Sequence, residues 1–231
     1  MLQAVVFDFD GVLANSEPLH LQAFQSALAE DGFALSTQEY YEQYVGFDDE
    51  GVFARLARAR GLTDADAWIA RMVSLKGARM QSLLDGASPL FPGADACVRS
   101  LASRVPVAIA SGAVRDEILQ VLETSGLADA FTAIVAAGET PRSKPAPDPY
   151  HRAVELMSQA RGTRLEPAFV AGIEDSVQGL VAARTAGLRT VGLTTTYRRF
   201  ETGLADVVLP AIAAVTFDCL SALCASDGRH E

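Results

Sequence analysis

Short apolar segments alternate with segments of helical periodicity over most of the chain, and this alternation limits the possible folds more than any other feature. The first apolar segment, residues 5–7, is followed by Gly11 and fits a strand that is buried on both faces. Further strands are predicted at residues 105–110, 133–137, 168–173, 190–193 and 207–209. Helices are predicted at residues 94–103, 115–125, 150–160, 176–186 and 217–224. Strands that alternate with helices of this length predict an α/β fold, with a doubly wound parallel sheet and a Rossmann-like core.

Residues 17–88 interrupt this alternation, because they carry helical apolar stripes and no convincing strand. Pro89 and the Pro92-Gly93 pair then mark the return to the alternating pattern. A helical block that follows a lone strand indicates a domain inserted into the sheet domain. We therefore expect two domains. Residues 1–15 and 89–231 form the α/β core, and residues 16–88 form an inserted all-helical domain.

The composition disfavours several classes of partner. The net charge of −10 argues against nucleic acid or an anionic membrane, although not against a small anionic substrate. The cysteines Cys97, Cys219 and Cys224 are an odd number without CxxC spacing, which is typical of reduced thiols in the cytoplasm. No signal peptide and no apolar run of membrane-spanning length is apparent. We expect a soluble, cytoplasmic monomer, with Arg198 and Arg199 in a solvated surface patch.

Two acids, Asp8 and Asp10, stand where the first predicted strand ends. With the two-residue period of a strand, both carboxylates lean to the same side of the sheet. Two such charges about 4 Å apart repel by about 4 kcal/mol at an effective dielectric constant near 20. A strand end keeps this pair only if a cation neutralises it or one acid is protonated. The pair therefore indicates a metal-assisted active site.

Polar residues follow four of the predicted strands. They are Asp8 and Asp10 after the first, Ser111 after the second, Lys144 beyond the third, and Glu174 with Asp175 after the fourth. In open α/β sheets, ligands bind outside the carboxyl ends of the strands, so the fold would bring all of these residues to one edge. Carboxylate oxygens with a single lysine suit Mg²⁺ together with a phosphoryl group.

Four motifs in this order make the sequence similar to the haloacid dehalogenase superfamily of phosphatases and phosphomutases. They are DFDGV at residues 8–12, ASG at 110–112, SKPAPDPY at 143–150 and GIEDSVQG at 172–179. Within that superfamily the chain most resembles the subgroup with a helical cap inserted after the first motif, which includes beta-phosphoglucomutase-like proteins. The resemblance implies that residues 16–88 form such a cap.

The resemblance also implies a role for each acid. Asp8 would be the nucleophile that forms an aspartyl-phosphate. Asp10 would be the general acid toward the leaving oxygen and then the base for the attacking water. Mg²⁺ would be held by Asp8, the backbone carbonyl of Asp10 and Asp175. Glu174 would bind the same ion directly or from the outer coordination sphere.

The remaining motif residues would bind the substrate. Ser111 and the backbone N–H of Gly112 would hold phosphoryl oxygens near a helix N-terminus. Lys144 would neutralise charge on Asp8 and on the phosphoryl group during transfer. Further contacts with the substrate are expected from His20 and Lys76 in the cap and from Arg115 beside the second motif.

The leading hypothesis is a phosphatase that hydrolyses a small phosphorylated metabolite. A beta-phosphoglucomutase-type mutase is the alternative. That subgroup carries basic residues in the first cap loop and polar residues after the second motif, whereas this chain has VGFDD at residues 45–49 and AVR at 113–115. Arg55 or Arg115 could compensate. A non-catalytic protein that binds a phosphorylated ligand is less favoured because the acids and the lysine are intact. A dehalogenase would need neither Mg²⁺ nor the general acid, and no lysine suited to phosphonate hydrolysis is identified.

Overall fold

The computed structural model describes the chain except for residues 46, 86–88, 196–202 and 226–231. The predicted patch at Arg198 and Arg199 lies outside the described residues. By its internal contacts the chain divides into two compact units. One contains Met1–Asn15 and Ser88–Glu231, which we call the core unit, and the other contains Ser16–Ala87, which we call the helical unit.

The core unit is built on a six-stranded parallel sheet. Its strands are β1 (Ala4–Phe7), β2 (Val107–Ala110), β3 (Ala133–Val135), β4 (Val170–Glu174), β5 (Arg189–Leu193) and β6 (Val207–Leu209). Their order across the sheet is β3-β2-β1-β4-β5-β6. The chain thus winds outward from β1 to β3 and then restarts at β4 on the other side of β1. This doubly wound order confirms the predicted fold class, and it places a switch point at the carboxyl ends of β1 and β4, where such folds bind ligands.

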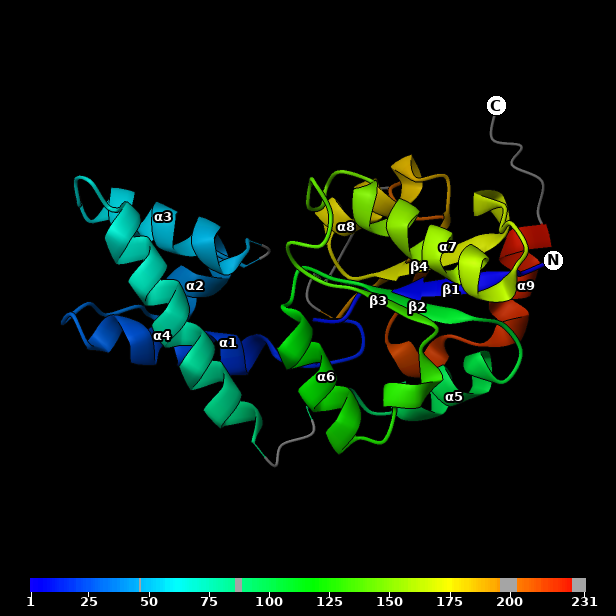
Figure 1. Ribbon diagram of the computed structural model, residues 1–231, viewed down its shortest axis with the longest axis horizontal. Helices are drawn as coiled ribbons and strands as arrows, with labels where there is room; N and C mark the ends of the chain where they lie inside the picture. The colour runs from blue at the N-terminus through cyan, green and yellow to red at the C-terminus, as the bar shows by residue number, and fades with distance from the viewer. Residues whose placement is uncertain (46, 86–88, 196–202, 226–231) are drawn as a thin grey trace. The chain divides into compact units, whose positions relative to one another are not determined.

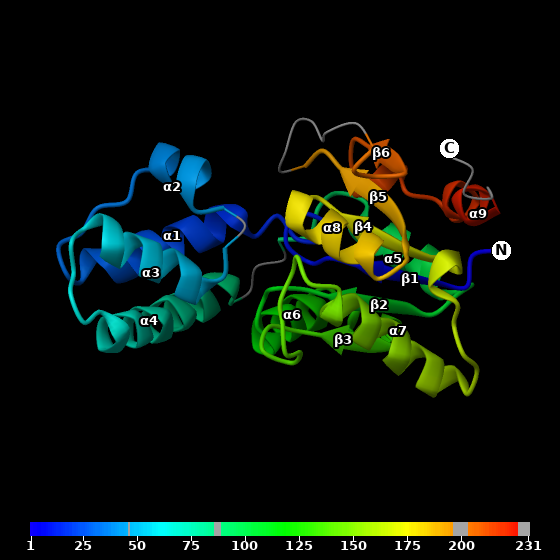
Figure 2. The same cartoon turned by 90° about the horizontal axis from the view of Figure 1, so that it is seen from above.

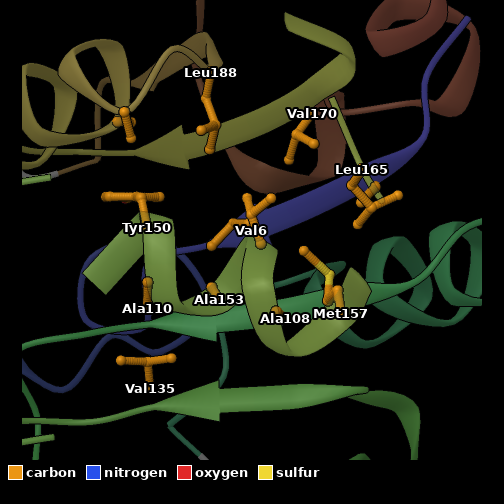
Figure 3. Close-up of a cluster of buried hydrophobic side chains, with 14 of the residues drawn as sticks. Val6, Ala108, Ala110, Val135, Tyr150, Ala153, Met157, Leu165, Val170 and Leu188 are labelled. Carbon is orange, nitrogen blue, oxygen red and sulfur yellow. The ribbon is translucent and has the colours of Figure 1, made fainter. Parts of the chain in front are cut away.

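Helices cover both faces of this sheet, with α7 and α8 on one face and α5 and α6 on the other (Figure 1). The helices of the core unit are α5 (Ala94–Ala102), α6 (Arg115–Thr124), α7 (Asp148–Arg161), α8 (Val177–Thr185) and α9 (Phe217–Ala225). Short 3₁₀ turns occur at Ala128–Ala130, Pro167–Phe169 and Ile212–Ala214. Figure 3 shows α7 packing Tyr150, Ala153 and Met157 over Val6 of β1 and Ala108 of β2, all of them buried. Burial on both faces explains why these strands read as continuous apolar runs.

Prolines account for two differences between predicted and observed boundaries. The second strand begins at Val107 rather than at residue 105, and Pro106 just before it has no backbone N–H to give to a sheet. Helix α7 begins at Asp148 rather than at residue 150, because Pro149 is tolerated in the first turn of a helix. Both differences are two residues long and leave the order of elements unchanged.

The helical unit consists of α1 (Glu17–Ala29), α2 (Thr37–Gln43), α3 (Asp49–Ala59) and α4 (Asp66–Leu84). Its described part contains no strand. Helix α1 packs along α4 (Figure 2). Phe24 of α1 and Phe53 of α3 meet in an edge-to-face contact, with ring centroids 5.1 Å apart. The buried apolar residues therefore give this unit a hydrophobic core of its own.

The chain leaves and re-enters the core unit through two adjacent segments, which we call the joint. Ala14 forms an antiparallel bridge with Leu90. The backbone N–H of Asn15 donates to the Pro89 carbonyl at 2.7 Å, and that of Phe91 donates to the Leu13 carbonyl at 2.9 Å. These bonds fix both ends of the inserted segment on the core unit.

Two further observations concern the predicted environment of the protein. No helix among the described residues is long and apolar enough to span a membrane. The three cysteines are free, and two of them, Cys97 and Cys224, are buried. Burial raises the pKa of Cys97 to about 12, so that its thiol stays protonated.

Candidate active site

The carboxyl ends of β1, β2 and β4 present the polar residues that the sequence pointed to. Asp8 directly follows β1, and Ser111 directly follows β2. Glu174 is the last residue of β4, and Asp175 comes next. Lys144 lies in the loop between β3 and α7. Because β1 pairs with both β2 and β4, these ends are neighbours in the sheet.

Lys144 is held between two buried carboxylates. Its ammonium is 2.8 Å from Asp8 Oδ1 and 2.5 Å from Glu174 Oε1. Asp8 Oδ1 also accepts a hydrogen bond from the backbone N–H of Phe9 at 2.8 Å. Charge-assisted hydrogen bonds of this kind are short and directional. The lysine therefore has a fixed position beside Asp8.

The surroundings shift the pKa values of this pair. Burial, with the nearby charges of Glu174 and Asp10, raises the pKa of Asp8 to about 7, although Lys144 opposes the change. Burial alone would lower the pKa of Lys144, but the carboxylates of Asp8 and Glu174 raise it above its ordinary value. The lysine thus stays charged, while Asp8 needs additional positive charge to be fully ionised at neutral pH.

Glu174 has further hydrogen-bond partners that are not among the predicted site residues. The Tyr150 hydroxyl donates to Glu174 Oε1 at 2.5 Å, and the Ser176 hydroxyl donates to Oε2 at 3.2 Å. Burial and the charge of Glu174 raise the pKa of Tyr150, so that it keeps its proton. A Cβ atom added to Gly179 would lie 1.9 Å from Glu174 Cδ, so glycine is needed there. Tyr150 belongs to the third motif, and Ser176 and Gly179 belong to the fourth. Membership of these motifs is the only sequence feature that could have identified them as site residues.

Three carboxylates form a cluster suited to a metal ion. Asp8, Glu174 and Asp175 are buried, and each places an oxygen within 4.8 Å of the other two. The Lys144 ammonium contacts two members of this cluster, Asp8 and Glu174. Carboxylate oxygens are the ligands that Mg²⁺ prefers, and buried like charges require a cation, so these donors fit the predicted ion.

Asp10 lies beside this cluster on a tight turn. The Phe9 carbonyl accepts the backbone N–H groups of Leu13 and Ala14, each at 2.9 Å. Gly11 has a φ of +75°, a conformation that side chains disfavour, and its N–H donates to the Ala14 carbonyl at 2.8 Å. The cluster of three carboxylates does not include the half-buried Asp10 side chain. The roles predicted for Asp10, as general acid and base and as a metal ligand through its backbone carbonyl, stay predictions.

The segment predicted to bind phosphate follows β2. Ser111 is buried, its backbone N–H donates to the Val135 carbonyl at 2.9 Å, and its hydroxyl accepts the N–H of Ala113 at 3.0 Å. That hydroxyl still has its proton to donate to a phosphoryl oxygen. Gly112 is exposed, and helix α6 begins at Arg115 rather than directly after the glycine.

The other predicted substrate contacts have partners within the protein. The Arg115 guanidinium binds Glu139 through two hydrogen bonds, of 2.6 and 2.8 Å. In the helical unit, the buried Lys76 ammonium is 2.9 Å from Asp49 Oδ2. His20 is half-buried in the first turn of α1. The structure thus brings the acids and Lys144 together at the sheet edge. Contact of Arg115, Lys76 and His20 with a substrate stays a prediction.

Comparison with known proteins identifies the family. The family model described as haloacid dehalogenase-like hydrolase matches residues 5–193. Protein CbbY of Rhodobacter capsulatus is 32% identical over 230 residues, which cover 96% of this chain and 99% of that protein. The phosphoglycolate phosphatase of Neisseria meningitidis is 31% identical, covering 85% and 82%, and hexitol phosphatase B of Escherichia coli is 27% identical, covering 92% and 94%. The chain therefore belongs to the haloacid dehalogenase-like hydrolase family, as the motifs predicted.

Solved structures agree with this assignment. CbbY of Rhodobacter sphaeroides in complex with phosphate has a TM-score of 0.81 and 28% identity, and covers 93% of this chain and 96% of that one. A variant of that protein, solved with xylulose-1,5-bisphosphate, has the same TM-score and 27% identity. The beta-phosphoglucomutase of Clostridium difficile has a TM-score of 0.79 at 21% identity, which shows the shared fold alone.

Proposed function

We propose that this protein is a Mg²⁺-dependent phosphatase that hydrolyses a small phosphate monoester, such as a sugar phosphate, through an aspartyl-phosphate. The observation that carries the proposal is the buried cluster of Asp8, Glu174 and Asp175 with Lys144 bound between two of its members. Mg²⁺ held by this cluster and the Asp10 carbonyl would offset the repulsion between a carboxylate nucleophile and an anionic phosphate.

The residues of the chain divide the reaction into two transfers. A carboxylate oxygen of Asp8 attacks phosphorus while the bond to the ester oxygen breaks, and Asp10 gives that oxygen its proton. Asp10 then accepts a proton from a water whose oxygen attacks the aspartyl-phosphate, which releases inorganic phosphate and restores Asp8. Lys144 and Ser111 hold the phosphoryl oxygens throughout, and Lys144 offsets the charge on them.

The structure favours a phosphatase over a mutase, because both arginines that could grip a second phosphate have partners. Arg115 is bound by Glu139 through two hydrogen bonds. The Arg55 guanidinium lies 3.8 Å above the centre of the Phe47 ring. A non-catalytic binding protein is disfavoured, since binding phosphate would not require two acids beside a buried lysine.

The named relatives suggest which substrates to try. The relatives are named as phosphatases of hexitol phosphates and phosphoglycolate, and the CbbY variant binds xylulose-1,5-bisphosphate. We propose that the helical unit is a cap that selects among such compounds. The net charge of −10 and the free thiols support a cytoplasmic protein without a nucleic-acid or membrane partner, and we propose that it acts as a monomer.

Release of inorganic phosphate from p-nitrophenyl phosphate tests the proposed chemistry. Wild-type protein should turn over with Mg²⁺ and stop after chelation, and Asp8→Asn should lower kcat by at least about 10³-fold. Unchanged turnover of a verified Asp8→Asn protein, or of metal-free protein, would contradict the mechanism.

A second assay separates phosphatase from mutase and ranks the substrates. With beta-glucose 1-phosphate and a bisphosphate primer, inorganic phosphate should form faster than glucose 6-phosphate. The opposite order would establish the mutase. Ranking hexitol phosphates, phosphoglycolate and xylulose-1,5-bisphosphate by kcat/KM then identifies the preferred class.

A further inference from the structure

The residues that hold the phosphoryl group belong to two different loops. Ser111 lies in the loop between β2 and α6, and Lys144 lies in the loop between β3 and α7. The second loop starts from β3, which is at the edge of the sheet and pairs only with β2 among the described strands. An edge strand gives the loop that follows it support from one side only. Contacts other than the strand pairing can therefore set the register of the two loops.

Backbone bonds continue the pairing of β2 and β3 a short way beyond the strands. The N–H of Ser111 donates to the Val135 carbonyl, and the N–H of Ala137 donates to the Ala113 carbonyl, both at 2.9 Å. Lys144 lies seven residues further along, outside this backbone pairing. The backbone alone thus leaves most of its loop without a tie to the first loop.

The side chains of Arg115 and Glu139 supply such a tie. Arg115 is the first residue of α6, and Glu139 lies between Ala137 and Lys144. Arg115 Nε is 2.6 Å from Glu139 Oε1, and its NH2 nitrogen is 2.8 Å from Oε2. This bidentate geometry fixes direction as well as distance.

Both partners of this pair are also bound to the backbone at the end of β3. The same NH2 nitrogen of Arg115 donates to the Ile134 carbonyl at 2.8 Å, and Glu139 Oε2 accepts the N–H of Ala136 at 3.1 Å. The hydrogen bond from Arg115 lowers the pKa of Glu139, and Glu139 raises that of Arg115. An exposed ion pair is commonly weak, but one with this number of fixed bonds is a stiff connection.

We propose that Arg115 and Glu139 form a clamp that keeps Ser111 and Lys144 at the spacing the phosphoryl group requires. In this role, which rests on the proposed phosphatase function, Arg115 is a positioning residue rather than a contact for the substrate. A displacement of about 1 Å in a catalytic group can cost up to about 10²-fold in rate. Loss of the clamp should therefore lower kcat more than it raises KM.

A double-mutant cycle tests the clamp with p-nitrophenyl phosphate as the probe. Arg115→Gln and Glu139→Gln should each lower kcat about tenfold with less than about a threefold change in KM, and the double variant should be no worse than either single one. Arg115→Lys, which keeps the charge but not the two-point contact, should fall between them and the wild type. Arg152→Gln, which removes a neighbouring positive charge that is paired with Glu155, is the matched control and should stay near wild type.

Hydrogen–deuterium exchange of the loop amides gives a readout that does not depend on turnover. Residues 136–144 should exchange faster in both single variants than in the Arg152→Gln control, with melting temperatures that show all variants to be folded. Unchanged exchange overturns the clamp whether or not the protein is a phosphatase. Faster exchange with unchanged kcat overturns its positioning role. If Arg115→Gln raises KM while Glu139→Gln does not, Arg115 contacts the substrate instead.

If the wild type releases no phosphate from any ester, the proposed function fails and exchange alone decides the clamp. Faster exchange of residues 136–144 in both variants supports it, and equal exchange overturns it.

Discussion

The core unit and the helical unit each bury a lysine against a carboxylate, but the carboxylates of the core unit belong to a cluster of three. Lys144 of the core unit contacts both Asp8 and Glu174, at 2.8 and 2.5 Å. Lys76 of the helical unit contacts Asp49 at 2.9 Å. The core cluster gathers three buried carboxylates, a donor set that suits a bound cation. The Lys76–Asp49 contact joins α4 to α3 within the helical unit.

The two units also share a buried tyrosine that donates to a glutamate. Tyr150 donates to Glu174 in the core unit, and Tyr40 donates to Glu17 in the helical unit, both at 2.5 Å. In the core unit the tyrosine and the lysine bind the same carboxylate. In the helical unit the buried Lys76 contacts Asp49. Burial of a tyrosine and a lysine against carboxylates therefore does not by itself mark an active site. Among the described residues, the cluster of Asp8, Glu174 and Asp175 distinguishes the core unit.

The largest difference is expected when each lysine is removed. Lys144→Met should lower kcat for p-nitrophenyl phosphate by about 10³-fold, because it removes the charge beside the nucleophile. It also removes the counter-ion of two buried carboxylates, which costs about 3–5 kcal/mol in the free energy of unfolding without Mg²⁺. Steady-state kinetics and urea unfolding measure these effects.

Lys76→Met is the matched variant. It should lower the free energy of unfolding by about 1–2 kcal/mol and change kcat by less than about threefold, because Asp49 remains partly solvated. A folded Lys76→Met protein with a much higher KM for a sugar phosphate would break the comparison and place Lys76 in the substrate site.

The second prediction concerns Asp8 and the pH dependence of stability. The folded pKa of about 7 lies above the ordinary value of 3.8, so the unfolded chain loses this proton first as the pH rises. The stability of the metal-free protein should therefore fall between these two pH values, by up to about 4 kcal/mol from this group. Asp8→Asn removes the loss, so it should melt at a higher temperature than the metal-free wild type at about pH 8. Equal melting temperatures would show that the folded protein does not raise the pKa of Asp8.

Asp31 of the helical unit should have the opposite effect on the pH dependence of stability. Its hydrogen bond from Trp68, with the ion pair to Arg71, lowers its pKa. The stability that it contributes is present above the ordinary pKa and is lost as the pH falls through the lowered one. Asp31→Asn should therefore destabilise the protein slightly at neutral pH, as thermal melting across pH would show.

Gly179→Ala should have the third largest effect. The added Cβ would meet the Glu174 carboxyl at 1.9–2.0 Å, so the carboxylate must move away from Lys144 and Tyr150. We expect kcat to fall by about 10²-fold even though alanine favours a helix. Gly77→Ala in α4 meets nothing within 4 Å and should stabilise the protein by about 0.5–1 kcal/mol with unchanged kcat. Activity of Gly179→Ala close to wild type would mean that Glu174 can be displaced without cost.

The smallest effect is expected from the tyrosines. Tyr150→Phe should lower kcat by about tenfold and weaken Mg²⁺ binding by a few-fold, because Glu174 loses one of the bonds that orient it. Tyr40→Phe should lower only the free energy of unfolding, by about 1 kcal/mol. Mg²⁺ binding is read from the shift of the melting temperature with Mg²⁺ concentration. Equal effects of the two variants on Mg²⁺ binding would remove the distinction between the units.

The sequence indicated much of the core site because topology determines where strand ends lie. Asp8, Glu174 and Asp175 follow apolar runs, and parallel strands bring their carboxyl ends to one edge. The same reasoning could not find Tyr150, because its reach to Glu174 depends on how α7 is rotated over the sheet. It could not pair Arg115 with Glu139 either, because their contact depends on which strand neighbours β2.

The helical unit was less predictable in detail. Its apolar stripes gave the helices, but the partner of a polar residue on a helix depends on packing angles that periodicity does not contain. The expected contact of Lys76 with the substrate stays a prediction, and its contact with Asp49 from another helix of the same unit was not predicted. The position of a strand end therefore says more about the neighbours of its charges than helical periodicity does.

The joint at Ala14 and Leu90 has a consequence for engineering the protein. The two chain segments already lie side by side there. For the core unit, the inserted residues 16–87 are therefore equivalent to a long loop whose two ends are bound together. The entropy of closing a loop grows only logarithmically with its length, so the size of this segment adds little to the cost of folding. A short glycine–serine linker, or an unrelated domain whose termini lie close together, could be grafted between Asn15 and Pro89 without altering the sheet.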